Sequence, residues 1–193
     1  MKNPFTVRNM PLIAILTAIE IVLQFIGNHI AFGPVSINLS LIPIALGAIT
    51  LGPWVGLFLG LINSLFVLLA PSTALFYNVS VAGTILIVLA KSSAAGFLGG
   101  LAYLLIHRYN NLMATIVTSI LVPVVNTGIF VVGALTFFRP ILEENSGSFA
   151  NIYEFLFRGM IGWNFIFEIS TSIVLIYPLY RLVNIYQQKY QAA

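Results

Sequence analysis

The stretch Leu39–Leu69, LSLIPIALGAITLGPWVGLFLGLINSLFVLL, is 31 residues long and carries no charged side chain. As one straight α-helix it would reach about 46 Å at 1.5 Å per residue, whereas the hydrocarbon core of a bilayer is about 30 Å thick. The pair Gly52-Pro53 divides the stretch, because proline disrupts a continuing helix but suits the first turn of a new one. The stretch therefore predicts a helical hairpin. Its first segment, Leu39–Leu51, is short for a full crossing, so we expect it to be tilted, partial or irregular.

Apolar runs of similar length continue on both sides of this hairpin. Of the 193 residues, 60% are hydrophobic and only 7% are charged, whereas soluble domains have about 25% charged residues. The runs are far longer than the roughly ten-residue strands of a membrane barrel. We therefore expect an all-α integral membrane protein, a six-transmembrane-helix bundle that forms a single membrane domain over residues 1–193. The expected spans are 11–30, 39–51, 53–69, 79–107, 112–138 and 159–183.

The basic residues outside the expected spans indicate the orientation of the bundle. Six spans place both termini on one side of the membrane. With both termini cytoplasmic, the inner side carries Lys2, Arg8, Arg108, Arg181 and Lys189, and the outer side carries Arg139 and Arg158 in a loop with three glutamates. This bias fits the positive-inside rule. The first span is expected to be retained and not cleaved as a signal peptide, because it is about 20 residues long and contains Glu20.

Four polar side chains fall at a similar depth in the fourth, fifth and sixth expected spans: Lys91, Asn126, Asn164 and Glu168. A lysine in the membrane centre costs about 2.5–3.5 kcal/mol on insertion scales, so it needs an anionic partner. Two interpretations stay open. Lys91 and Glu168 form a structural pair that joins two helices, or Lys91 binds a substrate carboxylate while Glu168 accepts hydrogen bonds from substrate hydroxyls. Asn126 likewise either lines a cavity or makes an interhelical hydrogen bond.

The first expected span has two unlike faces. Ala14 and Ala18 lie four residues apart on one side, and such small residues permit close helix packing. Glu20, Gln24 and Asn28 form a polar stripe on the opposite side at the same spacing. We expect the alanine face to dock a partner and the polar stripe to help hold a solute. Tyr77 and Asn78, in the loop after the third span, are expected to close an outer cavity, although an interfacial tyrosine is also a common membrane anchor.

Several classes of chemistry are not supported by the sequence. The chain has no cysteine and no G-x-x-x-x-G-K-[ST] loop for nucleotide binding. His29 and His107 fall at opposite membrane faces, so we expect no metal site and no cofactor. A net charge of +3 spread over helix ends is no signature of nucleic-acid binding. An intramembrane enzyme is disfavoured because nucleophiles and acid–base groups are few.

The chain resembles the substrate-binding S components of energy-coupling factor (ECF) transporters. The resemblance rests on six short spans, a cytoplasmic N-terminus, the A-x-x-x-A step Ala14–Ala18, and the P-x-x-x-G…GP form of Leu41–Pro53. It covers nearly the whole chain. It implies a non-enzymatic subunit that binds a vitamin or metal ion tightly near the outer face of the bacterial plasma membrane. It also implies docking through Ala14 and Ala18 to a transmembrane coupling subunit driven by two ATPases.

Within that family, Pro123–Phe130 (PVVNTGIF) is most similar to the pantothenate-specific branch. Pantothenate is a small anion with hydroxyls and an amide, which one cation with asparagines and a carboxylate would suit. Folate should need more cations, and cationic thiamine would be repelled by Lys91. Riboflavin, pyridoxine, folate or another small vitamin stays open as the substrate. A self-sufficient ion-coupled carrier, with Lys91, Glu20 and Glu168 as a proton relay, is the alternative from a different functional class.

Overall fold

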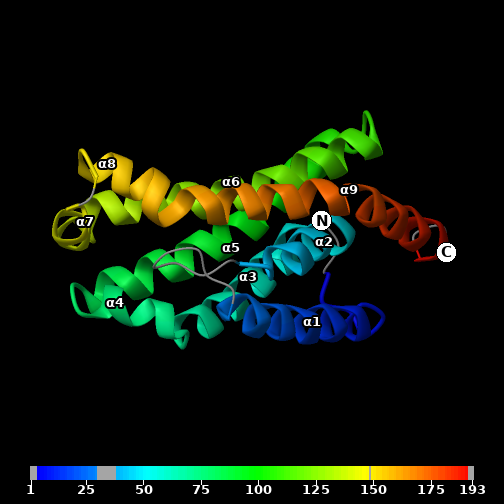
Figure 1. Ribbon diagram of the computed structural model, residues 1–193. Coiled ribbons are helices and arrows are strands. Elements are labelled where there is room, and N and C mark those ends of the chain that lie inside the picture. The colour runs from blue at the N-terminus through cyan, green and yellow to red at the C-terminus, as the bar shows by residue number, and fades with distance from the viewer. Residues whose placement is uncertain (1–3, 30–37, 148, 191–193) are drawn as a thin grey trace.

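A computed structural model describes residues 4–29, 38–147 and 149–190, without the side chains of 176, 177, 183 and 186–190. The described residues form helices and no strand. The helices are α1 (Met10–Asn28), α2 (Leu41–Leu51), α3 (Pro53–Leu68), η1 (Pro71–Thr73), α4 (Ala74–Tyr77), α5 (Val81–Ile106), α6 (Asn111–Thr136), α7 (Arg139–Asn145), α8 (Ile152–Glu154), the π-helix η2 (Phe155–Ile161) and α9 (Gly162–Tyr190). Figure 1 shows them packed as one elongated bundle.

The predicted break at Gly52-Pro53 is present. Helix α2 ends at Leu51 and α3 begins at Pro53, with Gly52 between them at φ 96° and ψ 178°. An L-residue with a side chain would be strained at that positive φ, so glycine suits the turn. Helix α2 has 11 residues and is about 16 Å long, roughly half the thickness of the hydrocarbon core. As expected, it is a partial segment, and most of its side chains are buried between other helices.

Helices α3 and α5 pack with their backbones in contact. A Cβ atom added to Gly60 would lie 2.2 Å from the Ser92 carbonyl oxygen, and one added to Gly96 would lie 2.1 Å from the Gly56 carbonyl oxygen. A Cβ atom on Gly100 would meet Pro53 at the start of α3. The small-residue spacing of these two helices therefore serves close packing inside the bundle. This packing brings Asn63 of α3 next to Ser92 of α5, which matters for the site below.

This packing makes Gly96 a sensitive position. We expect Gly96→Ala to destabilise the protein by about 2–3 kcal/mol, because the new methyl group overlaps backbone atoms that cannot turn aside. The matched control is Gly128→Ala on α6, where a Cβ atom meets nothing within 4 Å. There we expect unchanged stability or a gain of up to about 1 kcal/mol from helix propensity. Thermal unfolding of both variants in detergent checks the prediction, and equal midpoints would contradict the packing described here.

Three described helices are long and apolar enough to cross a membrane: α1, α5 and α6. Helix α3 and the η1–α4 segment, bent by 75° at their junction, together make a fourth candidate.

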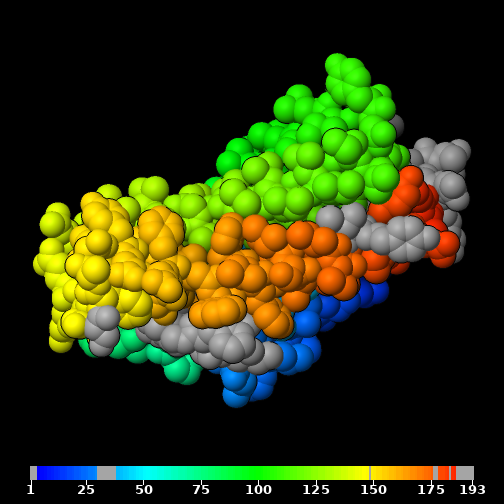
Figure 2. Space-filling view, turned by 45° about the horizontal axis from the view of Figure 1, so that its top comes forward, coloured from blue at the N-terminus to red at the C-terminus, as the bar shows by residue number. Residues whose placement is uncertain are grey.

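The α1 amino end, the α5–α6 turn and the carboxyl end of α9 lie towards one end of the bundle, and α4, α7 and α8 lie at the other (Figure 1). Helix α9 runs along α6 (Figure 2). Six crossings and cytoplasmic termini stay predictions, and Lys2 and residues 30–37 lie outside the described part.

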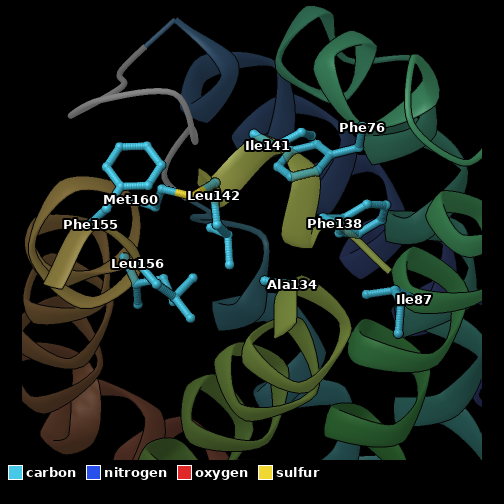
Figure 3. Close-up of a cluster of buried hydrophobic side chains, with 10 residues drawn as sticks. Phe76, Ile87, Ala134, Phe138, Ile141, Leu142, Phe155, Leu156 and Met160 are labelled. Atoms are coloured by element: carbon cyan, nitrogen blue, oxygen red, sulfur yellow. The ribbon is translucent and has the colours of Figure 1, made fainter. Parts of the chain in front are cut away.

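An apolar cluster closes the end of the bundle formed by α4, α7, α8 and η2 (Figure 3). Phe76, Phe138, Leu142 and Met160 are among its buried members. The segment that enters α9 is capped locally: the Ala150 N–H and the Arg158 guanidinium lower the pKa of the partly exposed Glu154 carboxyl below its ordinary value. This end of the bundle is therefore closed by packed apolar side chains. The predicted start of the sixth span, Gly159, falls inside the π-helix that precedes α9.

Candidate functional site

Two neighbouring cavities lie beneath this apolar cap. The first holds about 510 Å³ of empty space, part of it open to the outside, and is lined by Gln24, Asn38, Val67, Ser72, Thr73, Phe76, Thr84, Ile87, Val88, Lys91, Phe130 and Phe138. The second holds about 350 Å³, also partly open, and is lined by Asn38, Lys91, Asn126, Thr127, Phe130, Met160, Ile161, Asn164, Phe165 and Glu168. Asn38, Lys91 and Phe130 belong to both linings. These three residues therefore mark the junction of the two cavities.

Lys91 is the cation of this site. It lies in the middle of α5, and its Nζ atom stands 5.7 Å from the centre of the Phe130 ring, a cation–π contact. The two ion pairs within 4 Å among the described residues are Arg139–Glu143 and Arg158–Glu154, both on the surface. Lys91 and Glu168 thus line the same cavity without a direct ion pair. A cation that lies in a cavity against an aromatic face, with no carboxylate within 4 Å among the described residues, is suited to an anionic solute.

The second cavity gathers the polar residues expected at one depth. Asn126 comes from α6, Asn164 and Glu168 come from α9, and all three are buried. Asn126 Nδ2 donates to Ser92 Oγ at 3.1 Å, and Asn164 Nδ2 donates to the Met160 carbonyl at 3.1 Å. Glu168 Oε1 accepts a hydrogen bond from the Asn38 backbone N–H at 3.0 Å. Each side-chain amide has two N–H donors and an acceptor oxygen, and one donor of each is used in these bonds, so this wall offers several oxygen acceptors to a solute.

An aromatic wall bounds the first cavity. Phe76 lies edge-on to Phe130 with ring centres 5.7 Å apart, and it packs against Phe138 at 4.8 Å. Two threonines add polar atoms, but the Thr73 hydroxyl donates to the Val67 carbonyl and the Thr84 hydroxyl donates to the Ser80 carbonyl. Their remaining lone pairs can accept hydrogen bonds. The first cavity is thus mostly apolar, with Gln24, Ser72 and these threonines as its polar members, and Lys91 lies at its junction with the second cavity.

The polar stripe of α1 faces the interior, as the sequence predicts, but its members lie in different surroundings. Gln24 lines the first cavity, and its Nε2 donates to Asn28 Oδ1 at 2.8 Å. Glu20 is buried, lies in neither lining, and neither carboxyl oxygen has a hydrogen-bond partner in the described part of the chain. Glu20 makes no ion pair with Lys91 in the described residues.

The two loop residues predicted to close the cavity also lie outside both linings. The Tyr77 hydroxyl donates to the Leu68 carbonyl at 2.9 Å, which ties α4 back to the end of α3. Asn78 is exposed just after α4. From the neighbouring segment, Phe76 is the residue that reaches the first cavity.

Several lining residues were missed by the sequence analysis. Phe130 follows Asn126 by four residues on α6, so helical spacing from a suspected site residue could have indicated it. Asn38 reaches the junction from just before α2 and carries no periodic signal. Ser40 and Asn63, which line neither cavity but form hydrogen bonds behind Asn38, gave no signal either, because each is a small polar residue in an apolar run. Phe76 and Phe138 are typical core residues in sequence and become lining residues through the way the helix ends meet.

The alanine face of α1 lies on the outside of the bundle. Ala14 and Ala18 are exposed, as are Ile15, Ile19 and Val22 beside them. The opposite face of the same helix packs on α2 and α3 through Ile13 and Leu16. Helix α1 is thus an edge helix with its inner face committed to the bundle and its small-residue face uncovered.

The described part of the chain thus combines apolar helices long enough to cross a membrane with a mixed polar and aromatic cavity that holds a lysine, features that suit a membrane protein that handles a solute. The sequence model of the family "ECF transporter, substrate-specific component" matches residues 8–180. The chain therefore belongs to the ECF transporter substrate-specific components and is a transport subunit, not itself an enzyme. No curated protein and no solved structure matches the chain.

Proposed function

We propose that this protein is the high-affinity pantothenate-binding subunit of an ATP-driven ECF importer. The observation that carries the substrate assignment is the cation at the junction of the two cavities: Lys91 faces Phe130 and has no carboxylate within ion-pair distance in the described residues. Such a cation favours a monoanion. Family membership supports a vitamin as the solute.

The arrangement of donors and acceptors suggests how this solute lies in the site. Its carboxylate binds at Lys91, where the donors converge. Its hydroxyl groups point into the second cavity and donate to the oxygens of Asn126, Asn164 and Glu168. Its branched apolar part packs against the phenylalanines. Because Glu168 lines the same cavity as Lys91, the solute carboxylate is placed on the Lys91 side, where the cation offsets like-charge repulsion from Glu168.

The position of the cavities agrees with capture from outside the cell. They lie near the end of the bundle that carries α4, α7 and η2, and the described chain ends lie towards the opposite end (Figure 1). With both termini in the cytoplasm of a bacterial cell, the cavities face the outer half of the plasma membrane. Tyr77 at the end of α4 and Asn78 just after it then lie where a solute enters.

We further propose that Ala14 and Ala18 dock on a transmembrane coupling subunit, which two ATPases drive. Both alanines are exposed, and they present a smooth surface to which another helix can approach closely. Because the sequence contains no nucleotide-binding loop of the G-x-x-x-x-G-K-[ST] type, ATP hydrolysis is assigned to partners.

A binding panel tests the substrate assignment. The purified protein is titrated by calorimetry with pantothenate, riboflavin, pyridoxine, folate and thiamine, and any molecule that copurifies is identified by mass spectrometry. We expect tight binding of pantothenate and at least about a hundredfold weaker binding of thiamine, since Lys91 repels a cation. Tight binding of a different vitamin would replace pantothenate by that vitamin and leave the family assignment intact.

A further inference from the structure

Asn38 occupies the junction of the two cavities and carries an unused donor. The residue is 7% exposed and lines both cavities beside Lys91. Its backbone N–H donates to Glu168. Its side-chain Nδ2 is buried and has no hydrogen-bond partner in the described part of the chain. A buried amide donor without a partner is costly, so its presence beside a cation points to a ligand acceptor.

The Ser40 hydroxyl lies behind Asn38, away from both cavity linings. Ser40 is fully buried, and its Oγ atom lies within hydrogen-bond distance of three side-chain oxygens: Gln24 Oε1 at 3.1 Å, Asn38 Oδ1 and Asn63 Oδ1. A hydroxyl has one proton, so it can fully satisfy one of these acceptors at a time. When Ser40 donates to Asn38 Oδ1, the Asn38 side-chain amide is held in one orientation, with its Nδ2 on the side away from Ser40.

The other two acceptors belong to helices that are themselves held in place. Asn63 Nδ2 donates to Ser92 Oγ at 2.9 Å, and the same oxygen accepts from Asn126 of the second cavity. Gln24 belongs to α1 and bonds Asn28. The hydroxyl proton of Ser40 therefore has three possible acceptors. They are Asn38 at the cavity junction, Asn63, which is linked through Ser92 to Asn126, and Gln24 of α1.

From this geometry we propose that Ser40 is a positioning residue which sets the ligand selectivity of the site through Asn38. By donating to Asn38 Oδ1, Ser40 holds the Asn38 amide with its Nδ2 available to an acceptor bound at Lys91. Lys91 and Asn38 together then form a donor pair for a carboxylate. Without the Ser40 hydroxyl, the buried Asn38 oxygen has no donor, and the amide turns away from this orientation. The inference rests on the proposed function, since it needs an anionic vitamin at Lys91.

The experiment compares pantothenate with its primary-alcohol analogue, which lacks the carboxylate. We expect Ser40→Ala to weaken pantothenate binding about tenfold, the value of one lost hydrogen bond to a charged group, and to change binding of the alcohol less than about threefold. The matched control is Ser64→Ala. Ser64 is also a fully buried serine, but it lies in neither lining and its hydroxyl bonds to backbone carbonyls, those of Gly60 and Val88, and not to the Asn38 amide.

A double-mutant cycle separates positioning from general support of the structure. If Ser40 acts through Asn38, Ser40→Ala adds less than about twofold in an Asn38→Ala background. Ser40→Cys, which keeps the packing but donates weakly, gives the same comparison should the alanine variant fold poorly. Three results would each overturn this inference and leave the substrate assignment intact. They are an equal loss of affinity from Ser40→Ala in the native and Asn38→Ala backgrounds, an equal loss for pantothenate and its alcohol, or no loss of affinity. Failure of the native protein to bind pantothenate would overturn the substrate assignment and this inference with it.

Discussion

Replacing Ala14 and Ala18 together by tryptophan is expected to stop vitamin uptake by the assembled transporter and to leave vitamin binding unchanged. Both alanines are exposed on α1, on the face opposite the residues that pack against α2 and α3. Two bulky side chains would hold a docked helix away, and at about 2 kcal/mol for each overpacked position they would weaken association about a thousandfold. The cavities lie on the other side of α1, so ligand affinity should stay within about twofold.

The control for this double variant is Ala82→Trp, which enlarges an exposed alanine near the amino end of α5. It is expected to leave both uptake and binding at native levels. Uptake is measured as ATP-dependent accumulation of labelled vitamin in proteoliposomes, assembly by copurification with the coupling complex, and binding by calorimetry. Normal assembly and uptake by the Ala14/Ala18 variant would remove the docking assignment. Lost binding would show that this face also shapes the site.

Lys91→Met is expected to lower affinity for pantothenate by at least about a hundredfold. Methionine keeps the length and apolar stem of lysine but removes the charge, and loss of one partner from an enclosed charge pair costs about 2–5 kcal/mol. The Phe130 ring beside Nζ stays in place and packs against the thioether, so the cavity wall should persist. The pantothenate alcohol, which has no carboxylate, should lose far less affinity.

Arg158→Met provides the comparison for this variant. Arg158 is an exposed cation at the same end of the bundle, paired with Glu154 and outside both linings. Its replacement should change affinity less than about threefold, because an exposed charge is screened by solvent and salt. Unchanged pantothenate affinity in Lys91→Met, with the protein folded, would return Lys91 to the structural role left open by the sequence.

Hydrophobic length and helix breakers made much of the fold predictable. The uncharged run from Leu39 to Leu69 with its Gly52-Pro53 break predicts the α2–α3 hairpin correctly. The close α3–α5 packing follows from glycines four residues apart, because only a residue without a side chain lets two backbones touch. Hydrophobic length does not give the number of membrane crossings in the same way, since α2 is too short to span a bilayer alone.

Part of the site was predictable because charge and amides inside a membrane are rare. Lys91, Asn126, Asn164 and Glu168 were expected at one depth, and the structure brings all four to one cavity. Glu20 shows the limit of this reasoning. Helical spacing predicts the inner face of α1 for Glu20, and the side chain is buried there. The residues that Glu20 contacts depend on how α1 is rotated and shifted against α2 and α3, which helical spacing does not determine.

Other parts of the site arise only from tertiary structure. Asn38 lies just before α2, outside any helix, and its contact with Glu168 joins residues 130 positions apart. The phenylalanine wall forms where α4, α6 and the start of α7 converge, so its members look like ordinary core residues in the sequence. The short α8 and the π-helix before α9 depend on local capping and packing, which apolar composition alone does not specify.

The most direct test of the central claim is vitamin binding and transport by the purified chain alone. The protein is reconstituted in proteoliposomes, and labelled pantothenate is followed with an imposed proton or sodium gradient and then with the coupling complex and ATP. We expect tight, saturable binding by the lone chain, no accumulation with either gradient, and accumulation once the complex and ATP are present. Gradient-driven accumulation by the lone chain would contradict this account and favour a self-sufficient carrier.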